Sequence, residues 1–297
     1  MMDMKNNVTL LLMLMGCASA GALAQGTLCV SELLFQPRSG EAEYVEFYNS
    51  SATTVDLSDY VVIRWTGDSL GTHYSMPSHM VAPHDYVVVT KDAASVTANY
   101  NVKYSSKLVE CNLPTYPNDG GSVVLARTDG TVVEKFDYQP SMHSRLLRNK
   151  AGVALERRSM ERPCNEAGNW FSASSTACYG TPGYENSQSQ ECLVEETSFT
   201  FSSTLVSPDG DEYQDEVNID YQLEDNEIYA DAILFDARGT LVRRLLNNAL
   251  LGSHGSFSWD GRSEDGLLLP KGRYVLYINL HDLHGTRQTI KKALTIR

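Results

Sequence analysis

Basic residues are scarce in this chain of 297 residues. There are 24 Lys and Arg against 37 Asp and Glu, so the formal net charge is -13 and the isoelectric point is near 4.9. Because nucleic-acid affinity depends mainly on Lys and Arg that neutralise phosphates, this deficit argues against a nucleic-acid partner. Long apolar runs are also missing after the extreme N-terminus, which argues against a protein with several membrane-spanning helices.

Recognisable catalytic signatures are scarce as well. The sequence offers no Cys/His protease signature, no glycine-rich phosphate loop and no H-E-x-x-H pair, which are patterns that supply a nucleophile, an anion site or a metal site. Four histidines fall in or beside expected loops and are predicted to be exposed to solvent: His73, His79, His84 and His143. The sequence therefore predicts a non-enzymatic protein without a resident cofactor.

The N-terminus has the pattern of an export signal. Lys5 precedes an apolar run over residues 8–15, and small residues end in Ala22-Leu23-Ala24. This order predicts cleavage between Ala24 and Gln25 and a secreted or cell-surface protein, with the periplasm and the outer-membrane surface left open. Alternatively, residues 14–17 resemble a lipobox, in which Cys17 would be lipidated and would anchor the protein to a membrane.

Few cysteines remain after such a cleavage, and their number is odd. They are Cys29, Cys111, Cys164, Cys178 and Cys192. Disulfides are the default in an oxidising compartment, and the short spacing of Cys164 and Cys178 in one loop-rich stretch predicts a bond between them. The pairing of the other three stays open, and the lack of a C-x-x-C motif argues against a zinc site.

The sequence is rich in segments that have the pattern of β-strands. Short segments rich in Val, Tyr, Phe and Thr alternate with Gly, Asn, Asp and Pro clusters, which is typical of an all-β sandwich or barrel. The expected strands are 28–35, 44–49, 60–65, 86–90, 122–127, 131–138, 199–202, 217–223, 230–236, 240–246, 255–259 and 274–281. Asp129-Gly130 predicts a hairpin turn, and residues 92–100 predict one short turn of helix.

A polar tract without hydrophobic periodicity begins near Asn186 and divides the chain. It predicts an all-β protein with two immunoglobulin-like β-sandwich domains in tandem after a cleaved signal peptide. The expected bounds are 1–24 for the signal peptide, 25–188 for the first sandwich, 189–198 for the linker and 199–297 for the second sandwich.

The first expected sandwich resembles a lamin tail domain. The resemblance lies in residues 30–37 (VSELLFQP), 43–49 (EYVEFYN), 56–58 (DLS), 152–157 (GVALER), 169–172 (NWFS) and 181–186 (TPGYEN). In structural roles, the large apolar side chains of Trp65 and Trp170 are expected to fill the core of this sandwich. Glu32, Glu46 and Asn49 are expected to hydrogen-bond loop amides rather than to catalyse.

The second expected sandwich resembles the immunoglobulin-like module of the flagellar hook-cap protein. The residues that carry this resemblance are 207–211 (SPDGD), 233–239 (ILFDARG), 257–261 (FSWDG) and 269–274 (LPKGRY). Trp259 is expected to anchor its core beside an Asp260-Gly261 turn. The last strands also resemble the C-terminal sorting domains of type IX secretion, and the two readings stay open.

One acidic turn could supply part of a calcium site. Asp209, Asp211 and Asp215 place three carboxylates in one loop, and calcium prefers several oxygen ligands from such a loop. The later positions of an EF-hand loop are not matched, so an uncoordinated turn stays the alternative.

Together these features predict an exported interaction or structural protein of the bacterial envelope or exterior. The lamin-tail-like domain would be the binding module and the C-terminal domain a spacer or sorting module, with a protein or another envelope component as the expected partner. Two alternatives remain open. One is a carbohydrate-binding surface module, and the other is a cryptic hydrolase that uses first-domain histidines and carboxylates.

Overall fold

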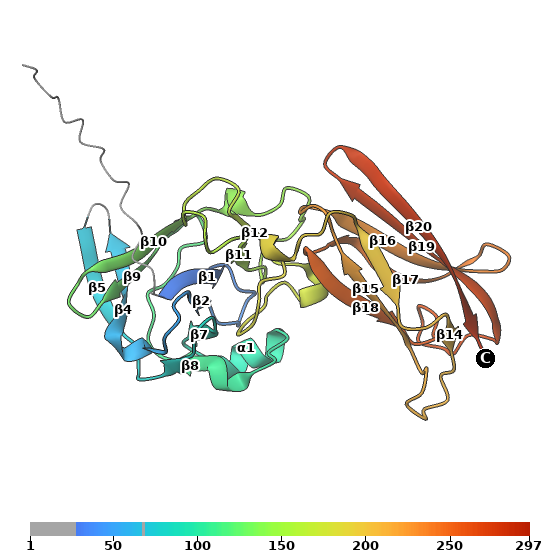
Figure 1. Cartoon of the computed structure of the whole chain (residues 1–297), viewed down its shortest axis with the longest axis horizontal. Coiled ribbons are helices and arrows are strands. Elements are labelled where there is room, and N and C mark those ends of the chain that lie inside the picture. The colour runs from blue at the N-terminus through green and yellow to red at the C-terminus, as the bar shows by residue number, and fades with distance from the viewer. Residues whose placement is uncertain (1–27, 67–68) are drawn as a thin grey trace, which may run out of the picture.

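The computed structural model describes residues 28–66 and 69–297. It consists of two β-structured bodies that lie side by side along the long axis of the molecule, the first from the N-terminal half and the second from the C-terminal third (Figure 1). The predicted signal cleavage between Ala24 and Gln25 and the alternative lipidation of Cys17 lie outside the described residues. Within the described part, no helix is long and apolar enough to cross a membrane.

The first body has two main sheets and one short strand pair. The six-stranded sheet has the order β12-β11-β1-β2-β7-β8, and the four-stranded sheet has the order β10-β9-β4-β5. The strands of the first are Trp170–Ser172, Leu155–Arg157, Leu28–Leu34, Tyr44–Asn49, Tyr86–Thr90 and Leu108–Glu110. Those of the second are Val132–Tyr138, Gly121–Arg127, Tyr60–Thr66 and Ser69–Ser75, and the short pair is β3 (Val55–Asp56) with β6 (Met80–Val81).

The core of the first body lies between these sheets. Alternate residues point to the same face of a strand, and the inward residues of β1, β4, β9 and β10 form one buried apolar cluster. The rings of Phe136 and Trp170 stack within it at 3.7 Å between centroids. Trp170 is therefore a core residue, as predicted. Trp65 instead packs on the outer face of the four-stranded sheet, where Lys135 Nζ lies 4.7 Å from the centre of its ring.

The local expectations for the first body hold. The turn between β9 and β10 is closed by the Gly130 amide, which donates to Arg127 O at 2.9 Å, and Gly130 has a φ of 91° that favours glycine. Among the described residues the one α-helix is α1 (Ala93–Asn99), capped by Asp92, whose side chain accepts from the Ser95 amide. Short 3-10 turns occur at Leu57–Asp59, Ser105–Lys107, Pro140–Met142, Ser175–Ala177 and Gln190–Cys192.

The second body is a sandwich of a three-stranded and a five-stranded sheet. The three-stranded sheet has the order β13-β15-β18, from Ser198–Phe201, Val217–Gln222 and His254–Trp259. The five-stranded sheet has the order β14-β20-β19-β16-β17, from Leu205–Val206, Gly285–Ile296, Gly272–Asp282, Tyr229–Asp236 and Leu241–Leu250. Trp259 is fully buried at the centre of its core and donates to Arg262 O, which confirms it as an anchor. The all-β, immunoglobulin-like prediction is confirmed for both bodies.

The predicted disulfide between Cys164 and Cys178 is not formed. All five cysteines among the described residues are free. Cys164 is buried against the first core, where its carbonyl accepts from Trp170 Nε1 at 2.7 Å. Cys178 is exposed and ends the 3-10 turn Ser175–Ala177 with a φ of 56°. The two thiols therefore lie in different surroundings, one buried and one exposed, and their closeness in sequence does not bring them together.

Candidate functional site

A row of three glutamates crosses the six-stranded sheet. Glu32 on β1 pairs with Glu46 on β2 on one side and with Glu156 on β11 on the other. All three side chains are fully buried. Like charges that lie directly opposite on neighbouring strands repel each other, so such a row persists only when protons or hydrogen bonds compensate the charge.

The segment that follows β12 supplies most of these hydrogen bonds. Glu32 accepts from the Thr181 amide at 3.0 Å and from the Tyr44 hydroxyl at 2.7 Å. Glu46 accepts from the Gly183 amide at 2.6 Å and from Ser31 Oγ at 2.8 Å. The expected role of Glu32 and Glu46 as acceptors for loop amides is thus confirmed.

Glu156, which no sequence motif marked as a hydrogen-bonding residue, completes the row. It accepts from Thr181 Oγ1 at 2.9 Å, from Ser187 Oγ at 2.8 Å and from the Gln188 amide at 2.9 Å. Asn186 fixes the same segment by donating to the Ser31 and Arg157 carbonyls. Glu156 lies on β11, and only the pairing of this strand with β1 reveals that it stands opposite Glu32.

Burial changes the protonation of the row. Burial, and after it the charge of Glu156, raise the pKa of Glu32 to about 8. Burial also raises the pKa of Glu156 to about 7, although hydrogen bonds from Ser187 and Thr181 act in the opposite direction. The pKa of Glu46 lies well above its ordinary value because of burial and the neighbouring Glu32. The row therefore holds protons near neutral pH, and no solvent-exposed carboxylate is available there for acid-base chemistry.

The same segment joins the two bodies. Residues 186–189 belong to the polar tract of the sequence, yet all four are buried. Ser187 O accepts from the Ser253 amide at 2.7 Å, and Gln188 Nε2 donates to Leu251 O at 3.2 Å. Gly252 lies so close that an added Cβ would meet Ser187 O at 2.2 Å. These contacts hold residues 251–253, which lead into β18, against the first body.

Further contacts extend the junction on both sides. Ser174 and Ser175 hydroxyls both donate to Leu250 O, at 3.1 and 2.7 Å. Tyr229, on β16, donates its hydroxyl to Ser144 Oγ, and its ring packs in a small apolar cluster with Phe171 and Leu250. The junction thus combines apolar packing with hydrogen bonds, which favours a fixed arrangement of the two bodies over free rotation.

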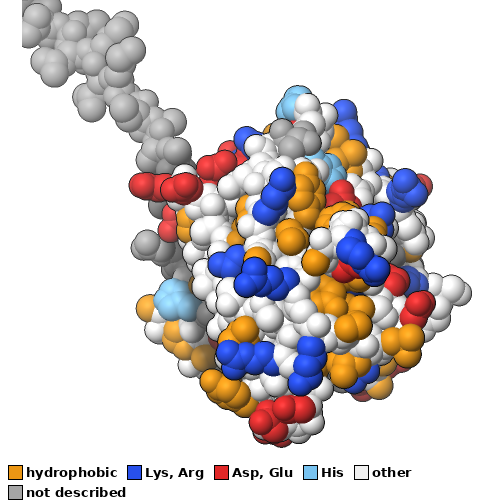
Figure 2. Space-filling model, turned by 90° about the vertical axis from the view of Figure 1, so that its right-hand side faces the viewer, with side chains coloured by type: hydrophobic (Ala, Val, Ile, Leu, Met, Phe, Trp, Pro, Cys, Tyr) orange, Lys and Arg blue, Asp and Glu red, His pale blue; other side chains and the backbone are white. Residues whose placement is uncertain are grey.

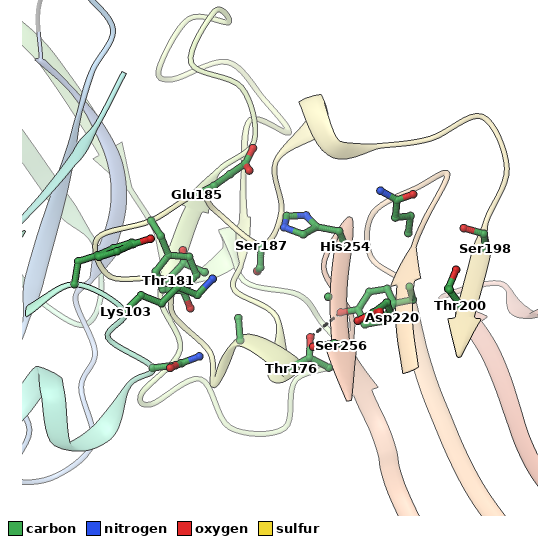
Figure 3. Close-up of a pocket in the computed structure, with 17 residues that line it drawn as sticks. Lys103, Thr176, Thr181, Glu185, Ser187, Ser198, Thr200, Asp220, His254 and Ser256 are labelled. Carbon is green, nitrogen blue, oxygen red and sulfur yellow. Dashed lines mark hydrogen bonds between the residues drawn. The ribbon is translucent and has the colours of Figure 1, made fainter. Parts of the chain in front are cut away.

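Beside the junction lies an open cleft of about 740 Å³ that both bodies line. Figure 3 shows Lys103 and Thr181 on the side of the first body, with Ser198, Thr200, Asp220 and Ser256 on the side of the second body. The hydroxyls of Thr176 and Tyr221 meet at 2.6 Å at its base. Hydroxyl, amide and charged groups predominate, so the cleft suits a polar ligand or a polar segment of a macromolecule.

The histidine expectations hold in part. His73 lies on β5 and His84 lies in a turn, and both are exposed. His143 is instead buried: its ring stacks on Phe35 at 5.4 Å, and Nδ1 lies 2.9 Å from Ser172 Oγ. Burial and the charge of Lys150 lower the pKa of His143 to about 4. The prediction of solvent exposure is wrong for His143, because the chain turns inward after the 3-10 turn Pro140–Met142.

The predicted calcium loop brings its three carboxylates together. Ligand oxygens of Asp209, Asp211 and Asp215 lie within 4.8 Å of one another. Both oxygens of Asp215 already accept loop amides, from Gly210 and Glu212 at 2.9 Å. These bonds give the cluster a role as a turn, and calcium binding stays a prediction.

One catalytic spacing is present in the sequence without its structural setting. Residues 67–71 read G-D-S-L-G, which matches the spacing of a nucleophile elbow. An elbow requires a sharp turn from a strand into a helix. Here Ser69 begins β5, which pairs antiparallel with β4 and is followed by the turn to β6. From Ser69 onward the described backbone therefore continues as a strand, and not as the helix that an elbow requires.

Comparison with known proteins supports the lamin-tail-like interpretation of the first body. Residues 22–140 match the family model of the Lamin Tail Domain. No curated protein matches the chain. The match covers most of the first body and includes Glu32 and Glu46, but it ends before Glu156 and before the segment whose amides these glutamates accept from.

Solved structures with partial likeness have low identity. The soluble domain of PmoD from Methylocystis sp. is 14% identical with a TM-score of 0.24, over 34% of this chain and 90% of that chain. Dimeric latent PorU from Porphyromonas gingivalis is 10% identical with a TM-score of 0.27, over 92% of this chain and 34% of that chain. PorZ, a surface component of the type IX secretion system of the same organism, is 10% identical with a TM-score of 0.26, over 86% and 35%. The chain spans about a third of the length of PorU and PorZ.

Proposed function

We propose that this protein is an exported, non-enzymatic interaction protein of the bacterial envelope or exterior, which binds a polar macromolecular partner in the cleft between its two bodies. The observation that carries the proposal is the fixed junction, because it presents cleft residues from both bodies in one constant arrangement. Preorganised sites lose less free energy on binding than mobile ones. The lamin tail domain model matched by residues 22–140 itself suggests a binding or structural module.

The interior of the first body supports the non-enzymatic part. Its perturbed carboxyl groups, Glu32, Glu46 and Glu156, are fully buried and hold backbone amides of one segment. A general acid or base must reach a substrate proton directly or through one water molecule, and these groups are covered by the chain. Their protonation therefore acts on stability.

The C-terminal body is proposed to serve as a spacer or a sorting module. Its end carries Lys and Arg side chains interspersed with hydrophobic ones, although the whole chain is acidic (Figure 2). Mixed basic and apolar surface suits contact with another protein more than with a polyanion alone. Mass spectrometry of the exported protein tests the sorting role, since a sorting domain is expected to be removed and a spacer retained.

A charge reversal in the cleft tests the binding proposal. Asp220 is exposed and lines the cleft, and Asp265 is also exposed, on a loop that does not line it. Crosslinking in envelope fractions should join the wild-type protein and Asp265→Lys to the same partner, whereas Asp220→Lys should lose it. An equal yield for both variants, or no crosslinked partner for the wild type, would contradict the proposal.

The carbohydrate alternative needs exposed aromatic rings that form a platform. Among the described aromatic residues, the strongly exposed ones are Tyr104 on the first body and Tyr213 on the second. Lys107 Nζ lies 4.5 Å from the centre of the Tyr104 ring, and Lys103 Nζ lies 3.9 Å from that of Tyr184. These ammonium groups occupy ring faces that a sugar would need, so we favour a protein partner. A glycan array with a reproducible hit would reverse this choice.

A further inference from the structure

Three side chains of metal-binding type meet beside the junction. Glu185 directly precedes the buried residues 186–189, Cys192 ends the 3-10 turn Gln190–Cys192, and His254 is the first residue of β18. One ligand atom from each lies within 4.8 Å of the others. Cys192 Sγ already donates to Glu185 Oε1 at 3.2 Å. The fold therefore brings together sulfur, oxygen and nitrogen donors that the sequence separates by up to 69 positions.

This donor set matches the chemistry of zinc. Zinc binds Cys, His and Asp or Glu in a tetrahedron, with bonds that place neighbouring ligand atoms about 3.3 to 3.8 Å apart. The three ligand atoms lie within 4.8 Å of one another, close to that spacing, and none of the three residues is fully buried. A thiolate and a carboxylate would together balance the charge of a divalent cation.

We propose that Glu185, Cys192 and His254 bind one zinc ion, with the fourth position open toward the cleft. The orientation of the open position follows from the lining of the cleft, which includes both Glu185 and His254 (Figure 3). His254 binds through Nε2, because Nδ1 lies 3.2 Å from Ser253 Oγ, an outer contact of the kind that orients ligating histidines. This inference goes beyond the proposed function and does not depend on it.

The zinc ion would tie the two bodies together. Glu185 and Cys192 lie on the chain that leaves the first body, whereas His254 lies on the second, one residue after the Ser253–Ser187 contact. A ligand that binds only the assembled junction stabilises it by mass action. Zinc is therefore expected to raise the midpoint of thermal unfolding and to protect the junction from proteolysis.

Proton release accompanies binding at Cys192. The Cys192 thiol donates to Glu185 Oε1, so it carries a proton before the metal binds. A zinc-bound cysteine is a thiolate. Affinity should therefore rise with pH, and the number of protons released should fall by about one in Cys192→Ser.

Cobalt and zinc titrations of the reduced full chain test the site. The wild type should bind one Co²⁺ with a thiolate-to-metal charge-transfer band, and Zn²⁺ should displace it. Cys192→Ser and His254→Ala should each weaken zinc binding by more than about 100-fold, which exceeds the usual loss from an outer-shell partner. Ser253→Ala should weaken it by about 10-fold with the stoichiometry retained.

Matched controls separate the site from adventitious binding. Cys178→Ser and His84→Ala remove an exposed cysteine and an exposed histidine elsewhere, and both should bind zinc like the wild type. Circular dichroism of each variant checks that it is folded. The proposal is overturned if the wild type binds no stoichiometric metal, or if Cys192→Ser keeps the charge-transfer band. Metal binding without a crosslinked cleft partner would support this site and contradict only the proposed function.

Discussion

The glutamate row makes the stability of this protein depend on pH in an unusual direction. A carboxyl group with a raised pKa binds more protons in the folded than in the unfolded state. Its contribution to stability is therefore complete below the unfolded pKa and is lost as the pH rises through the folded pKa. For Glu32 this interval runs from 4.5 to about 8. The free energy of unfolding should accordingly decrease between these two values.

The expected magnitude is large. Each tenfold change in proton affinity corresponds to about 1.4 kcal/mol, so ionising Glu32 in the folded state costs on the order of 5 kcal/mol. The total stability of a domain is only about 5 to 15 kcal/mol. Alkaline conditions should therefore destabilise the first body, because the ionised Glu32 and Glu156 are both buried and repel each other.

The variant Glu32→Gln isolates this contribution. The amide oxygen of Gln can still accept from Tyr44 and from the Thr181 amide, and its NH2 can donate to Thr181 Oγ1, which lies 3.2 Å from Glu32 Oε2. Urea unfolding at several pH values should show a flatter dependence for Glu32→Gln, with the variant more stable than the wild type at pH 9. Glu161→Gln, at an exposed carboxyl of the same body, should keep the wild-type dependence.

Two results would refute this reasoning. In the first, the free energy of unfolding rises from pH 5 to pH 8, and it rises by the same amount in the wild type and in Glu32→Gln. The other is a Glu32→Gln variant that is destabilised equally at every pH, which would mean that Glu32 is ionised and essential in the folded protein throughout this range.

Three further predictions concern other buried groups. The pKa of His143 is lowered from 6.5 to about 4, so neutral His143 contributes about 3 kcal/mol to the free energy of unfolding above pH 6.5, and this contribution is lost as the pH falls through 4. In urea unfolding, His143→Gln should lose less stability than the wild type over this acid range. Gly252→Ala places a Cβ 2.2 Å from Ser187 O, so it should destabilise the junction by about 1 to 3 kcal/mol in thermal unfolding. An unchanged midpoint of thermal unfolding in Gly252→Ala would contradict this close approach. With a thiol reagent and mass spectrometry, the exposed Cys178 should be labelled first and the buried Cys164 only on unfolding; a Cys164 as reactive as Cys178 would contradict the burial.

The sequence predicted the strands well because their signal is local. Alternating apolar residues and turn residues identified β1, β2, β4, β7, β9 and β10 within one or two positions. Trp259 and Trp170 were correctly expected in the cores, since large apolar side chains gain most from burial. The position of Trp65 could not be predicted in this way, because its face of β4 depends on which sheet covers that strand.

The site depended on contacts between distant segments, and these left little local signal. Glu32 and Glu46 were expected to hold loop amides, whereas Glu156 joins them only through the pairing of β11 with β1. The polar tract after Asn186 has the composition of a solvated linker, but its Ser and Gln side chains are buried because they satisfy Glu156 and the backbone of Leu251. Polar composition predicts exposure only where no buried partner awaits the polar groups.

The segment from Thr181 to Cys192 is where the separate features become one system. Its first half satisfies the glutamate row, its middle residues Ser187 and Gln188 hold β18 and Leu251, and its last residues approach His254. Ionisation of Glu32 and Glu156 places two buried, mutually repelling charges beside the first half, and the middle is bonded to the same Glu156 carboxyl through Ser187 Oγ. A change in protonation is therefore expected to reach the junction through one covalent segment, with no rearrangement of either sandwich core. The Ser253 amide donates to Ser187 O. At pH 9, the variant Glu32→Gln should accordingly increase the protection of this amide from hydrogen exchange more than that of amides in the centre of β19.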